Sequence, residues 1–235
     1  MSSWSINSTS IDTVVFDMDG VIFDTEQVWH AVRRDFAIRN GGHWTEADQA
    51  AVMGANSKQW SLYMRDECGV ALPPQDILAQ VIKELQDRYR RELIVYPGAG
   101  EAVAGLARRF RLGIASSSPA QLIETALEVA NMRRFFAALI SSDEVAHGKP
   151  EPDVYLAACA KLGAEPSRSA AVEDSTNGIR AAATAGLAVI AIPNKEFPPP
   201  PEVVSLAREV LPSISDLTVG VVTSLSEEVG YGPGK

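Results

Sequence analysis

The feature of this sequence that most constrains its fold is a repeated unit, in which a short apolar run stops abruptly at a polar residue or a turn. Such runs are typical of strands that are buried on both faces of a parallel sheet. They cover residues 13–16, 112–115, 170–172 and 187–192, with a weaker candidate at 138–140. Helical patterns alternate with them at residues 120–130, 153–162 and 177–185. This alternation predicts an α/β fold with a parallel sheet and helices on both faces.

A long helical stretch interrupts this alternation between residues 26 and 92. Four helical candidates, separated by glycine-containing segments, are recognisable there, and no strand is. They cover residues 26–39, 46–53, 58–68 and 75–92. We therefore expect two domains. Residues 1–24 and 93–235 form a core, and residues 25–92 form a small helical cap inserted after the first strand.

The composition excludes several classes of protein. With 235 residues, 46% of them hydrophobic, the chain can bury a substantial core, which excludes a disordered chain and a small disulfide-stapled or metal-stapled fold. Thirty acidic and twenty-one basic residues give a net charge of −9, which disfavours nucleic acid and anionic membranes as partners. A phosphate-bearing ligand would therefore need a local cationic site.

The cysteines and the first residues of the chain indicate the cellular compartment in which we expect the protein. Cys68 and Cys159 lack metal-binding spacing, and we expect both to be buried, reduced thiols. The first 32 residues contain no Lys or Arg, so no signal peptide is predicted, and no apolar run is long enough to span a membrane. We expect a cytoplasmic protein that is a monomer or a weak homodimer.

Polar side chains gather at the ends of the predicted strands, where open parallel sheets bind their ligands. They are Asp17, Asp19, Ser116, Glu173 and Asp174. Each could instead begin a turn or cap the next helix. Asp17 carries more weight, because an ionised carboxylate that directly ends a buried strand is costly unless a cation or hydrogen bonds satisfy it. Three carboxylates at one edge indicate a divalent metal site.

Four ordered motifs carry a resemblance to a known family. They are residues 17–26 with the pattern DMDGVIFDTE, then Ser116, then GKPEPD at 148–153, then EDSTNG at 173–178. In this order they resemble the motifs of the haloacid dehalogenase superfamily, over about residues 12–193. The chain is most similar to the branch of β-phosphoglucomutases and sugar-phosphate phosphatases, whose helical cap follows the first motif. The resemblance implies the Rossmann-like core of that superfamily.

The resemblance also implies roles for three catalytic residues. Asp17 is the nucleophile that attacks phosphorus and becomes a transient aspartyl-phosphate. Asp19 protonates the leaving oxygen and then activates water. An acid at this position indicates phosphoryl transfer, because dehalogenases of the superfamily lack it. Lys149 neutralises the nucleophile and the phosphate oxygens.

A Mg²⁺ ion and a phosphate-binding set are implied in the same way. The metal ligands would be Asp17, the backbone carbonyl of Asp19 and Asp174, with Glu173 as a further ligand or a supporting neighbour. The phosphate would be bound by Ser116, Ser117, Lys149 and the backbone loop that ends at Gly20.

Substrate specificity is expected to come from the cap. β-Phosphoglucomutases carry a His twelve residues after the nucleophile and a later Gly-Val-Ser-Arg run. Here these positions hold Trp29, with His30 beside it, and the run from Gly54 to Lys58. These departures favour hexose-phosphate phosphatases, such as 2-deoxyglucose-6-phosphatase, in which the aromatic residue lines the pocket. Substrate-binding candidates are therefore Trp29, His30, Gly54 and Lys58. Arg33 and Arg34 could also clamp a sugar hydroxyl or a second phosphate, although helix faces often carry such charges.

The leading hypothesis is a Mg²⁺-dependent phosphatase of small phosphorylated metabolites, with hexose or deoxyhexose phosphates as the expected substrates, acting through an aspartyl-phosphate. The alternative is a β-phosphoglucomutase that interconverts β-glucose 1-phosphate and glucose 6-phosphate. A third reading is a catalytically silent binding module on the same fold. Silent members usually lose a chemical group, whereas Asp17, Asp19, Lys149 and Asp174 are all present.

Overall fold

A six-stranded parallel sheet forms the centre of the protein. The computed structural model describes residues 10–52, 55–195 and 197–226. The strands follow the order β5-β4-β1-β6-β7-β8, and every neighbouring pair is parallel. They are β1 (Thr13–Phe16), β4 (Arg111–Ser116), β5 (Ala138–Ser141), β6 (Ser169–Glu173), β7 (Ala188–Ala191) and β8 (Glu209–Val210). The predicted α/β fold is confirmed, including the weaker strand candidate at 138–140.

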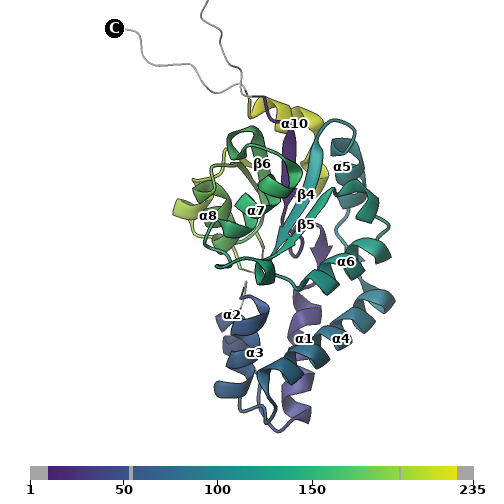
Figure 1. Cartoon of the computed structure of the whole chain (residues 1–235), viewed down its shortest axis with the longest axis vertical. Coiled ribbons are helices and arrows are strands. Elements are labelled where there is room, and N and C mark those ends of the chain that lie inside the picture. Colours follow the sequence, from purple (N-terminus) through teal and green to yellow (C-terminus); the bar gives the residue numbers. More distant parts are fainter. Residues whose placement is uncertain (1–9, 53–54, 196, 227–235) are drawn as a thin grey trace, which may run out of the picture.

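Helices cover both faces of this sheet. Side chains of β1 alternate between two hydrophobic clusters, with Val14 and Phe16 in one and Val15 in the other. Figure 1 shows α5 and α6 on one side of the sheet and α7 and α8 on the other. The helices that follow the insert are α5 (Ala99–Leu106), α6 (Ala120–Val129), α7 (Asp153–Leu162), α8 (Thr176–Thr184), α9 (Pro201–Val204) and α10 (Val219–Ser224). Short 3₁₀ helices cover Arg133–Phe135, Ser142–Glu144, Pro166–Arg168 and Ile214–Asp216.

Four helices lie between two short antiparallel strands, β2 (Phe23–Asp24) and β3 (Ile94–Val95). We call residues 26–92 the helical insert. Its helices are α1 (Glu26–Arg39), α2 (Glu46–Ala51), α3 (Ser57–Asp66) and α4 (Pro74–Glu92). They gather at one end of the molecule, below the sheet (Figure 1). The division of the chain into a core and a cap domain remains a prediction.

The insert begins and ends at one place because β2 and β3 pair there, with Phe23 opposite Val95. Polar contacts also join it to the rest of the chain. The Nε2 of Gln86 on α4 donates to the Oγ1 of Thr125 on α6 at 3.0 Å, and the backbone N of Ser57 donates to Asp143 Oδ1 at 3.0 Å. No helix in the described ranges is long and apolar enough to cross a membrane.

Candidate active site

The carboxyl edge of the sheet brings the motif residues together. Phe16 pairs with Ile114 on one side and Val172 on the other, so the carboxyl ends of β1, β4 and β6 lie close together at one edge of the sheet. A cavity of about 530 Å³ opens at this edge, and residues of the helical insert line its other side. The edge contributes Asp17, Asp19, Gly20, Ser116, Ser117, Ser118, Lys149 and Asp174, and the insert contributes Trp29, Arg33, Gln49 and Val52.

Asp17 is held by a buried lysine. The Nζ of Lys149 donates to Asp17 Oδ1 and to Glu173 Oε1, both at 2.6 Å. Burial raises the pKa of Asp17 to about 7, and the charges of Glu173 and Asp19 add to this rise while Lys149 opposes it. Burial lowers the pKa of Lys149, but the two carboxylates outweigh burial and hold it above its usual value. The lysine is therefore charged at neutral pH and compensates Asp17.

Glu173 is fully buried, and hydrogen bonds occupy both of its oxygens. Oε1 accepts from Lys149 and from the Tyr155 hydroxyl, the latter at 2.8 Å. Oε2 accepts from the backbone N of Asp174 at 3.0 Å and from the N and Oγ of Ser175 at 3.2 and 3.1 Å. These five donors fix the carboxylate, so Glu173 orients Lys149 toward Asp17.

Asp19 is oriented by two hydroxyl groups from different parts of the chain. Its Oδ1 accepts from Thr25 Oγ1 at 2.5 Å, and its Oδ2 accepts from Ser118 Oγ at 2.7 Å. Ser116 Oγ is more distant, at 3.5 Å, and accepts from the backbone N of Ser118 at 3.0 Å. The sequence did not indicate the roles of Thr25 and Ser118, and their only signal was a short polar side chain close to a motif.

Asp174 completes a group of acidic residues that can hold a divalent cation. Carboxylate oxygens of Asp17, Glu173 and Asp174 lie within 4.8 Å of one another. Burial raises the pKa of Asp174 well above its usual value, and the charges of Glu173 and Asp17 add to the effect. Oxygen ligands and excess negative charge suit a hard cation such as Mg²⁺. Because the oxygens of Glu173 are already occupied, Asp17 and Asp174 are the better placed ligands.

Gly20 allows its loop to approach this acidic group. Its φ of +81° disfavours other residues, and a Cβ there would lie 2.1 Å from Asp174 Oδ2. Its backbone N–H donates to the carbonyl of Phe23 at 2.9 Å, which closes the loop after β1. Within the described loop, therefore, the amide of Gly20 already has a partner, and phosphate binding by Gly20 remains a prediction.

The substrate-binding candidates of the insert lie in different places. Trp29 lines the cavity, and Ser117 lines it from the opposite side. The Nε2 of His30 lies 3.7 Å from Oε1 of Glu46. Lys58 is exposed on α3. Neither His30 nor Lys58 is among the described residues that line the cavity. Gly54 lies outside the described residues.

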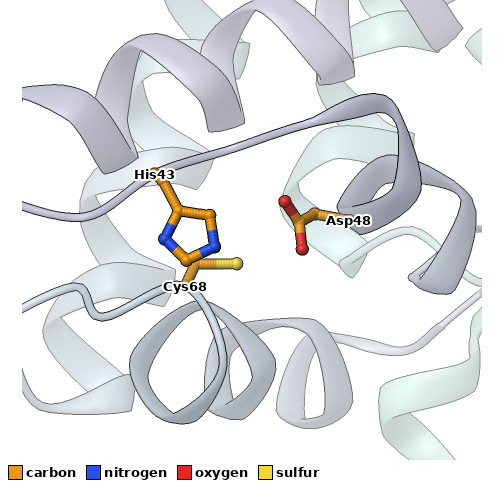
Figure 2. Close-up of side chains that lie close together, drawn as sticks. All are labelled: His43, Asp48 and Cys68. Atoms are coloured by element: carbon orange, nitrogen blue, oxygen red, sulfur yellow. The ribbon is translucent and has the colours of Figure 1, made fainter.

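A second cluster with metal-ligand chemistry lies inside the helical insert (Figure 2). Figure 2 shows the side chains of His43, Asp48 and Cys68 facing a common space. Asp48 Oδ2 accepts from the backbone N and Oγ1 of Thr45 at 2.7 and 2.6 Å, and Oδ1 accepts from the Tyr63 hydroxyl at 2.9 Å. Burial raises the pKa of the Cys68 thiol to about 12, so it is protonated at neutral pH. Asp48 therefore stabilises the start of α2 by capping it together with Thr45. The expected burial of Cys68 and Cys159 is confirmed.

The fold and the site together define a protein with an α/β fold that gathers acidic residues and a buried lysine at the carboxyl edge of its sheet. The chain belongs to the haloacid dehalogenase-like hydrolase family, whose model matches residues 11–186. This membership confirms the resemblance that the ordered motifs indicated.

Similar proteins indicate which reaction this chain catalyses. The chain is 31% identical to hexitol phosphatase B of Escherichia coli (strain K12) over 215 residues, 87% of this chain and 93% of that protein. It is 28% identical to the phosphorylated carbohydrates phosphatase of Thermotoga maritima over 178 residues, 75% of this chain and 82% of the relative. The crystal structure of CbbY from Rhodobacter sphaeroides in complex with phosphate matches with a TM-score of 0.81 and 25% identity, covering 91% of this chain and 99% of that one. The protein is therefore a phosphatase, and this conclusion replaces the reading of a silent binding module.

Proposed function

We propose that the protein is a Mg²⁺-dependent phosphatase of hexose or deoxyhexose phosphates that works through a phosphoryl group on Asp17. The observation that carries this proposal is the buried pair of Asp17 and Lys149 at one wall of the cavity, beside an Asp19 that two hydroxyl groups hold in place. A nucleophile, its counter-charge and an acid therefore meet where a phosphate ester can enter.

In the first step, an Asp17 oxygen forms a bond to phosphorus while the bond from phosphorus to the sugar oxygen breaks. Asp19 gives its proton to that leaving oxygen. In the second step, Asp19 takes a proton from water, and the water oxygen attacks phosphorus. Inorganic phosphate then leaves and the Asp17 carboxylate is restored.

Charge compensation is the main requirement of this reaction. Lys149 balances Asp17 before the attack and can contact the phosphoryl oxygens during it. Asp17, Asp174 and the backbone carbonyl of Asp19 would hold Mg²⁺, which would supply positive charge to those oxygens. We assign Glu173 to orienting Lys149, because its oxygens already accept five hydrogen bonds.

The cavity and the relatives support this substrate class. A volume of about 530 Å³ accommodates a ligand of the size of a sugar phosphate. Trp29 supplies an aromatic wall on the side of the helical insert. Two relatives are named hexitol phosphatase B and phosphorylated carbohydrates phosphatase. We further propose that the insert acts as a mobile cap that excludes water, and that the enzyme works in the cytoplasm as a monomer or weak homodimer.

The experiment is an assay of phosphate release from a panel of substrates, with Mg²⁺ and again with EDTA. The panel contains glucitol 6-phosphate, glucose 6-phosphate, 2-deoxyglucose 6-phosphate and β-glucose 1-phosphate. Mg²⁺-dependent release from one or more of them supports the proposal. If β-glucose 1-phosphate yields glucose 6-phosphate without phosphate release, once a bisphosphate primer is added, the enzyme is a mutase.

Stabilisation by Mg²⁺ should depend on pH. The folded pKa of Asp17, about 7, lies above its ordinary value of 3.8. Protonated Asp17 therefore contributes stability that is fully present below about pH 4 and lost as the pH rises through 7. Mg²⁺ favours the ionised form, so at pH 5.5 it must displace a proton, which weakens its binding about 30-fold. We expect the rise in Tm caused by Mg²⁺ to be much larger at pH 8 than at pH 5.5.

This measurement has a direct control. In Asp174→Asn one proposed ligand loses its charge, so the rise in Tm with Mg²⁺ should shrink at pH 8. An equal rise at both pH values in the parent protein would contradict the assignment of the metal to the site around Asp17.

A further inference from the structure

Three side chains that can bind a metal meet inside the helical insert (Figure 2). They are His43 in the loop before α2, Asp48 on α2 and Cys68 just after α3. An imidazole nitrogen, a carboxylate oxygen and the sulfur lie within 4.8 Å of one another. None of the three is among the described residues that line the cavity at Asp17. The proposed function therefore does not account for this cluster.

The backbone holds two of these residues together. The backbone N of His43 donates to the carbonyl of Cys68 at 2.9 Å. Gly42 allows this close approach, because a Cβ there would lie 2.5 Å from the same carbonyl oxygen. The loop before α2 and the end of α3 therefore present His43 and Cys68 as a fixed pair. Because the two residues are far apart in the sequence, the spacing of the cysteines gave no sign of a metal site.

Asp48 supplies a fixed and charged third ligand. Thr45 donates twice to its Oδ2, and the Tyr63 hydroxyl donates once to its Oδ1. A carboxylate has about four acceptor positions, so Oδ1 keeps one for a cation. Burial raises the pKa of Asp48, but the hydrogen bonds outweigh burial and hold it below its usual value. No Lys or Arg in the described part of the chain forms an ion pair with Asp48.

The donor atoms determine which ion fits. Thiolate, imidazole and carboxylate are the ligands of Zn²⁺, whereas Mg²⁺ takes oxygen ligands. Tetrahedral Zn²⁺ places such atoms about 3.3–3.6 Å apart, so side-chain movements of about 1–1.5 Å close the cluster around the ion. The C-terminus of α3, two residues before Cys68, adds partial negative charge that favours a cation. His43 is exposed, so an ion can enter from solvent and water can be the fourth ligand.

We propose that His43, Asp48 and Cys68 form a binding site for one Zn²⁺ ion, which joins the loop before α2 to the end of α3. On binding, the Cys68 thiol gives its proton to water and its sulfur forms a bond to Zn²⁺, since a bound metal ion deprotonates a coordinating thiol. The thiolate and the Asp48 carboxylate then balance the charge of the ion. Gln49 and Val52 follow Asp48 and line the active-site cavity, so the ion would stabilise one of its walls.

Co²⁺ is the probe that tests the site, because it occupies the same tetrahedral sites as Zn²⁺. A bond between a thiolate and Co²⁺ also gives a charge-transfer absorption band in the near ultraviolet. The full chain is freed of metals and titrated with Co²⁺ in excess Mg²⁺. The acidic group at Asp17 contains no sulfur, so this band reports on a cysteine ligand alone. We expect the band to appear and then to disappear as Zn²⁺ displaces Co²⁺. Zn²⁺ should also raise the Tm.

The two buried cysteines give a matched pair of variants. Cys68→Ser should abolish the band. It should weaken Zn²⁺ binding, measured by calorimetric titration in excess Mg²⁺, by more than the roughly 100-fold that loss of an outer hydrogen-bond partner can cost. Cys159→Ser should keep the band and the affinity, because the sulfur of Cys159 lies beside the Ser169 hydroxyl and belongs to no metal-ligand group of the described residues. Thermal denaturation in EDTA checks that each variant is folded.

The histidines give a second pair, in which folding is not at risk. His43 is exposed, so His43→Gln should keep the fold and still weaken Zn²⁺ binding at least about tenfold. His147→Gln is the control, because His147 is exposed in the loop before α7 and contacts Asp153. Its Zn²⁺ affinity should equal that of the parent chain.

Three results would overturn the site. They are a parent chain without the thiolate band, a band that survives Cys68→Ser, and a Zn²⁺ affinity that His43→Gln leaves unchanged. None of these results bears on phosphate release, which depends on the acidic group at Asp17. The zinc site and the proposed function can therefore fail separately.

Discussion

Asp17→Asn is expected to stop phosphate release, lowering kcat by at least about a thousandfold. The amide oxygen of Asn is not a useful nucleophile, so no phosphoryl group can be transferred to it. The change preserves size, and the new side chain can still accept the hydrogen bond that Lys149 gives to Asp17 at 2.6 Å. Binding of the substrate should therefore survive, and the loss should be in kcat rather than in KM. Steady-state phosphate release measures both.

The matched control is Asp35→Asn. Asp35 is partly exposed on α1, where Arg34 donates to it, and it is not among the described residues that line the cavity, so the same chemical change there should leave kcat unaltered. Residual turnover of Asp17→Asn within tenfold of the parent would show that Asp17 is not the nucleophile.

Lys149→Met is expected to affect both activity and stability. Its ammonium is the one described cation that contacts Asp17 and Glu173, and its side chain is 4% exposed. Removing one partner of a buried ion pair costs about 3–5 kcal/mol. The nucleophile also loses its counter-charge, so its pKa should rise further above 7 and a smaller fraction should be ionised at neutral pH. We expect turnover to fall by at least about a hundredfold.

The loss of stability should depend on pH in a definite direction. Without Lys149, the folded pKa of Asp17 rises further above its value in the unfolded chain. Such a group favours the folded state when protonated, so the destabilisation should be largest at pH 8 and smaller at pH 5. Urea unfolding in EDTA at the two pH values measures it. Lys161→Met is the control, because Lys161 is exposed and contacts only the carbonyl of Leu139, at 3.4 Å, in the described structure. An equal loss at both pH values would contradict the electrostatic explanation.

Most of the sheet could be predicted because its central strands are buried on both faces and are therefore continuous apolar runs. The predicted run at residues 13–16 is β1, with every residue buried. The strands β2, β3 and β8 were not predicted, because each has two residues and a pattern of that length cannot be distinguished from a loop. β2 and β3 nevertheless determine where the helical insert leaves the core and returns.

Site residues could be predicted where they belong to a sequence motif. They could not be predicted where tertiary contacts determine which side chains face the cavity. The positions of Asp17, Lys149 and Asp174 follow from the motifs at the carboxyl edge. By contrast, the adjacent Arg33 and Arg34 look alike in the sequence, yet one is buried beside the cavity and the other is exposed. The sequence did indicate that Trp29 and Arg33 share a face of α1, because they are four residues apart. Which face turns inward depends on α3 and Trp60, which no local pattern reveals.

The central claim is that Asp17 carries the phosphoryl group, and trapping that group tests it most directly. The parent enzyme is mixed with Mg²⁺ and a substrate that it hydrolyses, quenched in acid within one turnover, digested and examined by mass spectrometry. The proposed mechanism predicts one added phosphoryl group on the peptide that contains β1, assigned by fragmentation to Asp17, and none in Asp17→Asn. Full turnover without any phosphorylated peptide, or with the phosphoryl group on Asp19, would contradict it.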